Sequence, residues 1–266
     1  MSIVDFHGSI LVFHFIIGGV VALDKKMGHA ELATLVGRED RSAMLYAITD
    51  RRLYAENETD ARSRLLELAA TWAASGVAYI QLREKDLSAR EQLDLARAIM
   101  LAMRSTAEAN GLQAPRLLIN ARVDVALAAG ADGVHLPARP DELTPEEVRR
   151  IFVGAGRARP PLLSIACHTL EEVEMARRQS ADYILFAPVF EKVVQRNAGK
   201  AGSAQQLPGS GLPLLEEACR TAAPVPVFAL GGVTAGNALD CIRAGAVGVA
   251  AIRLLQEPAS VWREFA

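Results

Sequence analysis

The fold of this chain is decided by one stretch, Tyr79-Ile80-Gln81-Leu82-Arg83-Glu84-Lys85-Asp86. Its first half is apolar and is typical of a short buried strand, whereas its second half is typical of a charged loop that follows the strand. Taken alone, two cations and two carboxylates at the end of a strand are equally typical of a solvated turn. The stretch becomes informative because the same event recurs along the chain.

Five later apolar runs also end at polar side chains or glycines. The runs at residues 117–119, 133–134, 163–165, 184–186 and 227–230 lead in turn to Asn120, His135, His168, Glu191-Lys192 and Gly231-Gly232. Strands that deliver such groups at their carboxyl ends predict a parallel barrel with its functional site on that face.

Residues with helical spacing separate these runs, and a helix is expected at residues 234–244 among others, so we expect a single α/β domain that folds as a (β/α)₈ TIM barrel. Eight strand–helix units in roughly 215 residues fit this architecture. The similar segments 129–134 and 244–249 are interpreted as structural αβ turns without chemistry. Residues 193–210 are expected to form a long loop, either a mobile lid or a disordered segment. The expected strands are residues 44–48, 77–82, 116–120, 133–136, 162–166, 183–186, 226–230 and 248–252.

Helix starts carry recognisable caps. A capping box is expected at two of them, and a proline at the first helical position marks a third. The positions are Ser88 with Glu91, Thr169 with Glu172, and Thr144 before Pro145.

Composition narrows the functional classes. The 266 residues are 51% hydrophobic and 23% charged, with a net charge of −2 and 5% aromatic residues. A near-neutral chain with few aromatics offers no electrostatic footprint for nucleic acid. The three cysteines, Cys167, Cys219 and Cys241, lack metal-ligand spacing and indicate reduced thiols in a cytoplasmic protein.

Residues 1–43 do not match the barrel pattern and are expected to be an N-terminal extension, with the barrel at residues 44–266. The apolar run at residues 9–23 is shorter than the ~20 residues of a membrane helix, and His14 interrupts it. No Lys or Arg precedes this run, so it is a poor signal peptide. A membrane anchor is the less favoured alternative, and we expect no membrane partner.

Two cationic or anion-binding positions stand out at the expected barrel mouth. Gly231-Gly232 precedes a helix and exposes backbone N–H groups that suit a phosphate, although a tight turn explains the pair equally well. Arg253 lies just after the last strand and adds a charge for the same phosphate. Arg83 and Lys85 form a second cationic centre.

Three polar residues keep a structural alternative. Arg83 pins its loop if it pairs with Glu84 or Asp86. His168 is better explained as a bond to loop backbone than as a base, and His135 is undecided between the two roles.

These motifs resemble the thiamine phosphate synthase/TenI family. The resemblance spans about residues 44 to 255, and the motifs occur in order at the strand ends derived above. The matching segments are residues 46–51, 81–86, 120–126, 133–136, 167–172, 181–183, 188–190 and 231–233.

The resemblance implies a transferase of thiamine biosynthesis that joins a hydroxymethylpyrimidine diphosphate to a thiazole phosphate and releases pyrophosphate. Mg²⁺ would hold the leaving group. It implies that Gln81, Arg83 and Lys85 hold the pyrimidine and its diphosphate, and that Asn120 contacts the pyrimidine or the leaving group. Gly232 and the backbone near Ile252 would bind the thiazole phosphate.

The sequence departs from the synthase pattern at the expected metal ligands. Ala121 stands where a metal-binding Asp is expected, and the second Asp is displaced by one position to Asp141. Hard cations need anionic oxygens, so the loss of one carboxylate weakens Mg²⁺ binding. Ala166 stands near the end of the fifth strand, where the family pattern has a residue with a hydroxyl group. Lys192 or Lys200 replaces the lysine of the run after the sixth strand.

Three functions therefore stay open: the transferase, a TenI-like thiazole tautomerase that moves a proton, and a non-catalytic barrel that binds a thiamine-related ligand. Arg83 and Lys85 favour the transferase, because a tautomerase has no diphosphate to hold. Ala121 and Ala166 favour the other two, yet Pro188 occupies the position of the TenI histidine. The expected partners are small phosphorylated substrates. A homo-oligomer is compatible with the sequence, which does not decide the oligomeric state.

Overall fold

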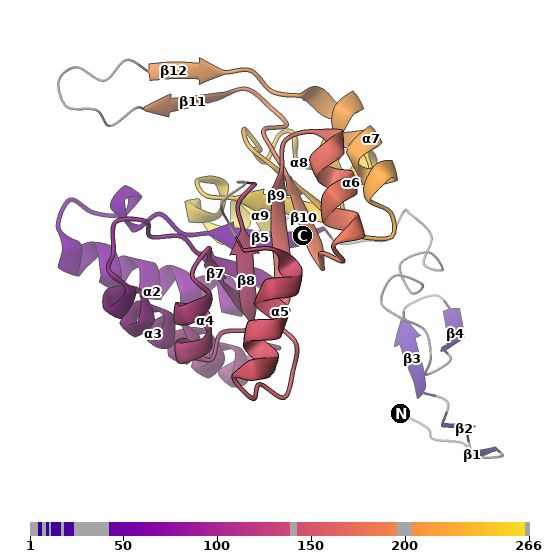
Figure 1. The fold of residues 1–266 in the computed structure, drawn as a ribbon, viewed down its shortest axis with the longest axis horizontal. Coiled ribbons are helices and arrows are strands. Elements are labelled where there is room, and N and C mark those ends of the chain that lie inside the picture. Colours follow the sequence, from indigo (N-terminus) through magenta and orange to yellow (C-terminus); the bar gives the residue numbers. More distant parts are fainter. Residues whose placement is uncertain are drawn as a thin grey trace. The chain divides into compact units, whose positions relative to one another are not determined.

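The computed structural model describes residues 43–138, 143–195 and 204–263, together with four short strands before residue 24 (Figure 1). Contacts divide the chain into two compact units, Met1–Arg41 and Ser42–Ala266, each described here by itself.

The first unit contains two antiparallel strand pairs. Strand β1 (Asp5–Phe6) pairs with β2 (Ser9–Ile10), and β3 (Val12–Ile16) pairs with β4 (Gly19–Leu23). The apolar run that we weighed as a membrane anchor therefore contains strands. None of the helices in the described ranges is long and apolar enough to cross a bilayer.

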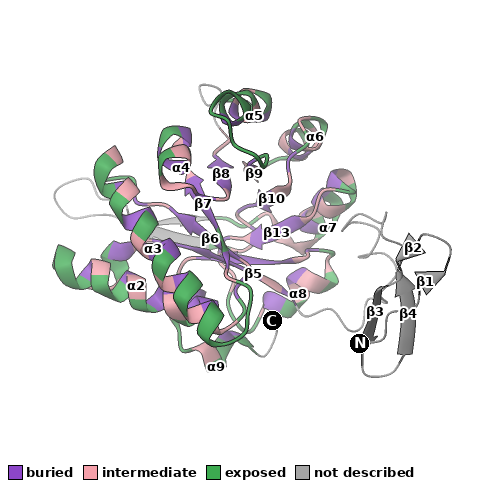
Figure 2. Cartoon of the chain, turned by 90° about the horizontal axis from the view of Figure 1, so that it is seen from below, coloured by how far each residue is buried: buried purple, intermediate pink, exposed green. Residues whose placement is uncertain are grey.

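The second unit is a closed parallel barrel with the strand order β5-β6-β7-β8-β9-β10-β13-β14 (Figures 1 and 2). Strand β5, the first barrel strand in the sequence, pairs with β14, the last, and this pairing closes the barrel. This confirms the expected fold. The strands are β5 (Met44–Ile48), β6 (Tyr79–Leu82), β7 (Arg116–Asn120), β8 (Gly133–Leu136), β9 (Leu162–Cys167), β10 (Tyr183–Phe186), β13 (Val227–Leu230) and β14 (Gly248–Ala251).

Helices surround the barrel, with buried inner faces against the strands and exposed outer faces (Figure 2). The capping boxes expected at Ser88 and Thr169 are present, and Thr144 forms a third with Glu147. The helices are α2 (Glu58–Ala74), α3 (Ala89–Ala109), α4 (Val123–Ala129), α5 (Pro145–Gly154), α6 (Leu170–Arg178), α7 (Gly211–Ala222), α8 (Ala238–Arg243) and α9 (Ala259–Trp262), with 3₁₀ turns η1 (Arg51–Leu53) and η2 (Leu254–Gln256).

Two expectations about local structure were wrong. The segment expected as a loop at residues 193–210 contains an antiparallel hairpin, in which β11 (Lys192–Gln195) pairs with β12 (Ala204–Leu207). The helix expected at residues 234–244 begins four residues later, as α8. Its first residues instead form a turn, because the Asn237 side chain accepts from the N–H of Thr234 and donates to the carbonyl of Gly232.

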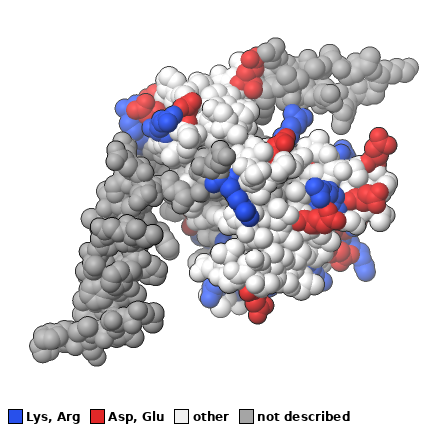
Figure 3. Space-filling view, turned by 180° about the vertical axis from the view of Figure 1, so that it is seen from behind, with Lys and Arg blue, Asp and Glu red and all other residues white. Residues whose placement is uncertain are grey.

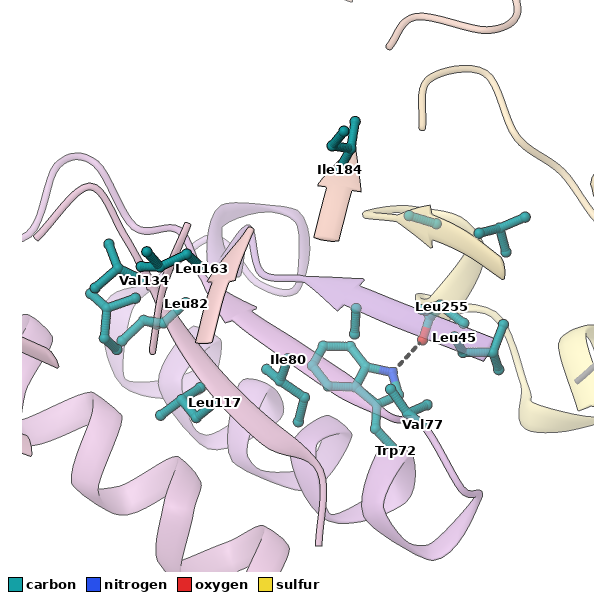
Figure 4. Packing of buried hydrophobic residues seen from close by; sticks show 14 of the residues in the cluster. Leu45, Trp72, Val77, Ile80, Leu82, Leu117, Val134, Leu163, Ile184 and Leu255 are labelled. Carbon is teal, nitrogen blue, oxygen red and sulfur yellow. Dashed lines mark hydrogen bonds between the residues drawn. The ribbon is translucent and has the colours of Figure 1, made fainter. Parts of the chain in front are cut away.

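The barrel packs two separate layers. Outward strand residues such as Leu45, Ile80 and Leu117 are buried against the helices (Figure 4). The indole of Trp72 in α2 donates to the carbonyl of Leu255 over 2.7 Å, which joins the first barrel helix to the end of the chain. The inward residues alternate with these and form the second layer. That layer contains Tyr46, Tyr79, Leu118, Leu185, Phe228 and Ala250.

The αβ turns at residues 129–134 and 244–249 have the structural role that the sequence predicts. A Cβ added at Gly133 would lie 1.9 Å from the carbonyl oxygen of Leu162, and one at Gly248 would lie 1.9 Å from that of Met44. Neighbouring strands therefore approach too closely for any side chain. The preceding Asp132 carboxylate accepts from the N–H of Leu117 and fixes the turn.

We predict that residues 1–42 are dispensable for the barrel, because β5 begins at Met44 and pairs with β14 and β6. Ala43 is only 5% exposed, so the truncated protein keeps this residue. A chain that starts at Ala43 should unfold at the same temperature as the full chain, measured by circular dichroism. A chain that starts at Tyr46 loses part of β5 and should fail to fold. Loss of soluble protein from the first truncation would contradict the prediction.

Candidate functional site

Three neighbouring strands place polar side chains at the carboxyl end of the barrel. Ile48 pairs with Gln81 across β5 and β6, and Asn120 pairs with His135 across β7 and β8. Gln81 Nε2 donates to Asn120 Oδ1 over 3.0 Å, so the structure brings these two predicted residues together. Gln81 is 1% exposed, and its Oε1 has no hydrogen-bond partner among the described residues. A buried acceptor without a partner is costly and marks a place for a ligand donor.

One arginine that our sequence analysis did not single out organises the adjacent loop. Arg51 is 3% exposed, and its guanidinium donates to Glu58, Glu84 and Asp86 over 2.7–3.0 Å. Its backbone N–H also donates to Glu84 over 3.1 Å. The Arg51 guanidinium holds the pKa of Asp86 below its usual range. The charged loop after β6 is thus tied to the turn after β5.

The alternative in which Arg83 pairs with Glu84 or Asp86 is therefore wrong, because Arg51 takes both carboxylates. Arg83 is held instead through its backbone N–H, which donates to Thr49 Oγ1 over 2.9 Å. Within the ranges that the structure describes, no carboxylate lies in ion-pair distance of the Arg83 guanidinium. Lys85 is exposed in the same loop.

His135 is buried in the barrel and holds a hydrogen bond with Ser164. Its Nδ1 lies 2.8 Å from Ser164 Oγ, which in turn lies 3.0 Å from the Tyr46 hydroxyl. Burial lowers the pKa of His135 to about 3, and the charge of Arg83 acts in the same direction. His135 is therefore a neutral ring near Arg83, not a cation.

The position of the expected metal ligand carries no oxygen. Ala121 follows β7 in the left-handed region, at φ +60°, and its N–H donates to the carbonyl of His135 over 2.8 Å. Asp141 lies outside the described residues. Among those that are described, no group of three or more His, Cys, Asp and Glu side chains could hold a metal ion. Glu84 and Asp86, the two carboxylates nearest in sequence to Arg83, are already engaged by Arg51.

The Gly231-Gly232 turn is both tight and open to a ligand. Both glycines have positive φ, +93° and +67°, and a Cβ at Gly232 would lie 2.6 Å from the carbonyl oxygen of Glu191. The structural explanation thus applies. At the same time, the N–H groups of Gly232 and Val233 donate no hydrogen bond within the described part of the chain. The turn can therefore present free donors to an anion.

The remaining predicted residues divide between the mouth and the loops. Ile252 directly follows β14 and contacts the inner layer, and Arg253 after it is exposed. His168 binds loop backbone, since its Nδ1 lies 2.6 Å from the carbonyl of Ala187. This contact is the one expected of a structural role, and binding of substrate by His168 stays a prediction. Lys192 begins β11, and the structure describes its backbone but not its side chain.

The three cysteines are free thiols, and burial raises their pKa values, to about 12 for Cys167. None is poised as a nucleophile. On the face seen in Figure 3, cationic and anionic side chains of the described residues are interspersed. The absence of a nucleic-acid partner stays a prediction.

Comparison with known proteins gives a consistent result. The family model described as thiamine monophosphate synthase matches residues 45–255. The thiamine-phosphate synthase of Methanoculleus marisnigri is 39% identical over 211 residues, which cover 78% of this chain and 85% of that protein. The enzyme of the same name from Roseiflexus castenholzii is 36% identical over 209 residues, 79% of each chain.

A solved structure shows the same architecture. Thiamine phosphate pyrophosphorylase from Pyrococcus furiosus superposes with a TM-score of 0.63 at 26% identity, covering 85% of this chain and 96% of that one.

We predict that Arg51→Ala destabilises the fold by ~3 kcal/mol, because it leaves Glu84 buried without its cation. Urea unfolding followed by fluorescence measures the change. Arg52→Ala is the matched control. Arg52 is largely exposed, and among the described residues its one ion pair is with Asp86, so its loss should cost less than ~1 kcal/mol. Equal effects of the two substitutions would contradict the role of Arg51.

The effect of Arg51→Ala should depend on pH. The folded-state pKa of Asp86 is lowered, so its contribution to stability is complete above the unfolded value of ~3.9 and is lost as the pH falls below it. The difference in unfolding free energy between the wild type and Arg51→Ala should therefore shrink between about pH 4 and pH 2. A constant difference over this range would show that Asp86 does not contribute.

Gly232→Ala should lower the unfolding free energy by at least ~1–2 kcal/mol, because the left-handed backbone penalises a side chain and Glu191 blocks it. Gly236→Ala is the control, since the nearest atom to its Cβ would be 3.9 Å away. Its stability should change by less than ~0.5 kcal/mol. Urea titrations of both variants make the comparison, and an unaffected Gly232→Ala protein would contradict it.

Proposed function

Because the chain belongs to the thiamine monophosphate synthase family, we propose that it joins a hydroxymethylpyrimidine diphosphate to a thiazole phosphate, with release of pyrophosphate. The observation that carries the proposal is the division of charge after β6. Arg51 binds the carboxylates of Glu84 and Asp86, and Arg83 is left without a carboxylate partner in the described residues. A guanidinium held in this way at a barrel mouth is suited to an anionic substrate.

The pyrimidine end of the reaction is assigned to strands β6 and β7. Gln81 supports the pyrimidine ring through its free Oε1, and Asn120, which holds the Gln81 amide, lies beside it. Arg83 and Lys85 hold the diphosphate. Lys192 is proposed as a third cation near the leaving group. Charge grows on pyrophosphate as it departs, so contacts with these cations strengthen in the transition state and lower the barrier.

The thiazole phosphate is assigned to the opposite side of the mouth. The free N–H groups of Gly232 and Val233 lie after β13, and Ile252 with Arg253 follows β14. Phosphate sites of (β/α)₈ barrels commonly lie after the seventh and eighth strands. The nucleophilic ring nitrogen would then approach the pyrimidine from a fixed direction, which reduces the entropic cost of the encounter.

Mg²⁺ remains part of the proposal only as an expectation from the family. The described residues contain no group of three or more His, Cys, Asp and Glu side chains that could hold it, and Ala121 supplies no side-chain oxygen. This observation favours the alternative candidate, a thiazole tautomerase that needs no metal. Against the tautomerase, Pro188 replaces the expected histidine. We also propose a cytoplasmic location, in keeping with the three free thiols.

The deciding experiment incubates the protein with the pyrimidine diphosphate and the thiazole phosphate, with and without Mg²⁺, and measures thiamine phosphate. We expect product and a strong dependence on Mg²⁺. Formation of a thiazole isomer without thiamine phosphate would favour the tautomerase, and the absence of both products would favour a binding protein.

Arg83→Ala should lower turnover by about ten- to a hundredfold, because a charge-assisted contact is worth ~1.5–3 kcal/mol and ~1.4 kcal/mol corresponds to a decade. Arg83→Lys should recover only part of the loss if the contact is bidentate. Steady-state kinetics and the melting temperature are measured on the same protein, with Arg52→Ala as the control for loss of a nearby cation. A large fall in melting temperature with normal turnover would contradict the diphosphate role.

A further inference from the structure

A chain of three buried side chains crosses the barrel interior. His135 in β8 bonds to Ser164 in β9, and Ser164 bonds to Tyr46 in β5. Tyr46 and Ser164 are 0% exposed and His135 is 5% exposed. His135 and Ser164 are direct partners in the strand register, so the backbone fixes their approach. The proposed function gives this hydrogen-bonded series of three side chains no role.

The Tyr46 hydroxyl determines which group donates and which accepts in each of these hydrogen bonds. Burial raises its pKa, so the hydroxyl keeps its proton at neutral pH. Its one hydrogen-bond partner among the described residues is Ser164 Oγ. A buried donor without an acceptor costs ~1–3 kcal/mol, so Tyr46 donates to Ser164. The proton of Ser164 then has His135 Nδ1 as its acceptor.

The opposite tautomer of His135 fails a count of donors and acceptors. If Nδ1 carried the proton, it would donate to Ser164, and either the Ser164 or the Tyr46 hydroxyl would lose its acceptor. A charged ring is also disfavoured, because burial and Arg83 both lower the pKa of His135. The arrangement in which the hydroxyl protons of Tyr46 and Ser164 both have an acceptor is a neutral ring with its proton on Nε2.

His135 lies near the carboxyl end of β8 (Gly133–Leu136). Nε2 makes no hydrogen bond to another described residue, whereas Nδ1 is used inside the barrel. On the neighbouring strands, Asn120 is the register partner of His135, and Gln81 Oε1 also lacks a partner in the described ranges. The mouth thus offers an N–H donor on β8 and a carbonyl acceptor on β6.

We propose that Ser164, supported by Tyr46, is a positioning residue that holds His135 as the neutral Nε2–H tautomer, so that His135 donates a hydrogen bond to the heterocyclic substrate. The identity of that substrate rests on the proposed function, whereas the tautomer does not. A neutral donor suits an uncharged ring nitrogen. Together with the acceptor on Gln81, it suits a ring that carries an acceptor nitrogen and a donor group.

The first test uses the unmodified protein. The chain has five histidines, so ¹⁵N–¹H correlation spectra of the imidazoles are simple, and a His135→Gln sample assigns the resonance. We expect Nε2 to carry the proton, Nδ1 to be unprotonated, and neither signal to move between pH 5 and pH 8. A proton on Nδ1, or an imidazolium in this range, would overturn the tautomer assignment whatever reaction the protein catalyses.

The second test uses Ser164→Ala, in which Nδ1 loses its donor. We expect its ¹⁵N signal to move, and KM for the pyrimidine diphosphate to rise by roughly three- to tenfold while KM for the thiazole phosphate is unchanged, since a hydrogen bond is worth ~0.5–1.5 kcal/mol. Tyr79→Phe is the matched control. It removes a hydroxyl from the same aromatic cluster, but that hydroxyl bonds Tyr183, so His135 should be unaffected.

Addition of the pyrimidine diphosphate to the unmodified protein completes the design. We expect the Nε2 proton of His135 to shift on binding. If the pyrimidine diphosphate binds and leaves this proton unmoved, the donor role is overturned. If it does not bind at all, the proposed function fails, and the tautomer is still decided by the first spectrum.

Discussion

The ion cluster centred on Arg51 is the interaction on which the site depends. Four bonds from one buried guanidinium and its backbone bind the loop after β6 to the turn after β5. Because Glu84 and Asp86 direct their oxygens to Arg51, the neighbouring Arg83 makes no ion pair with either of them in the described residues. A single stretch of alternating charge thus serves two purposes, with its acids holding the loop and the Arg83 guanidinium left for the mouth.

The barrel could be predicted from the sequence because each strand carries its own evidence. Apolar runs such as residues 116–120 end at a polar residue, and the three N-caps mark where helices begin. The prediction failed where the local signal is weak. The hairpin of β11 and β12 has a composition typical of loops. The start of α8 was missed because Asn237 caps a turn that helical periodicity does not reveal.

The site was predictable only in part, since side-chain partners depend on which strands meet. The stretch at residues 79–86 identified the cations but gave the wrong partner for its acids, because Arg51 is 33 residues from Glu84. Ser164 carried no signal in an apolar strand, and only the register against β8 brings it to His135. Ala166 is the next inward position of the same strand. The hydroxyl that the family resemblance places at that position is thus found one layer deeper in this chain.

Barrel closure has a consequence for synthesis of the chain. Strand β5 needs β14 as one of its two neighbours, and the paired residues Met44 and Gly248 are separated by about 200 residues of sequence. The indole N–H of Trp72 likewise has no acceptor until Leu255 has been synthesised, because it donates to the carbonyl of that residue. On the ribosome, the growing polypeptide therefore exposes an unpaired edge of the apolar strand β5 until β14 has been translated. The last strand to emerge completes the hydrogen bonding of the first.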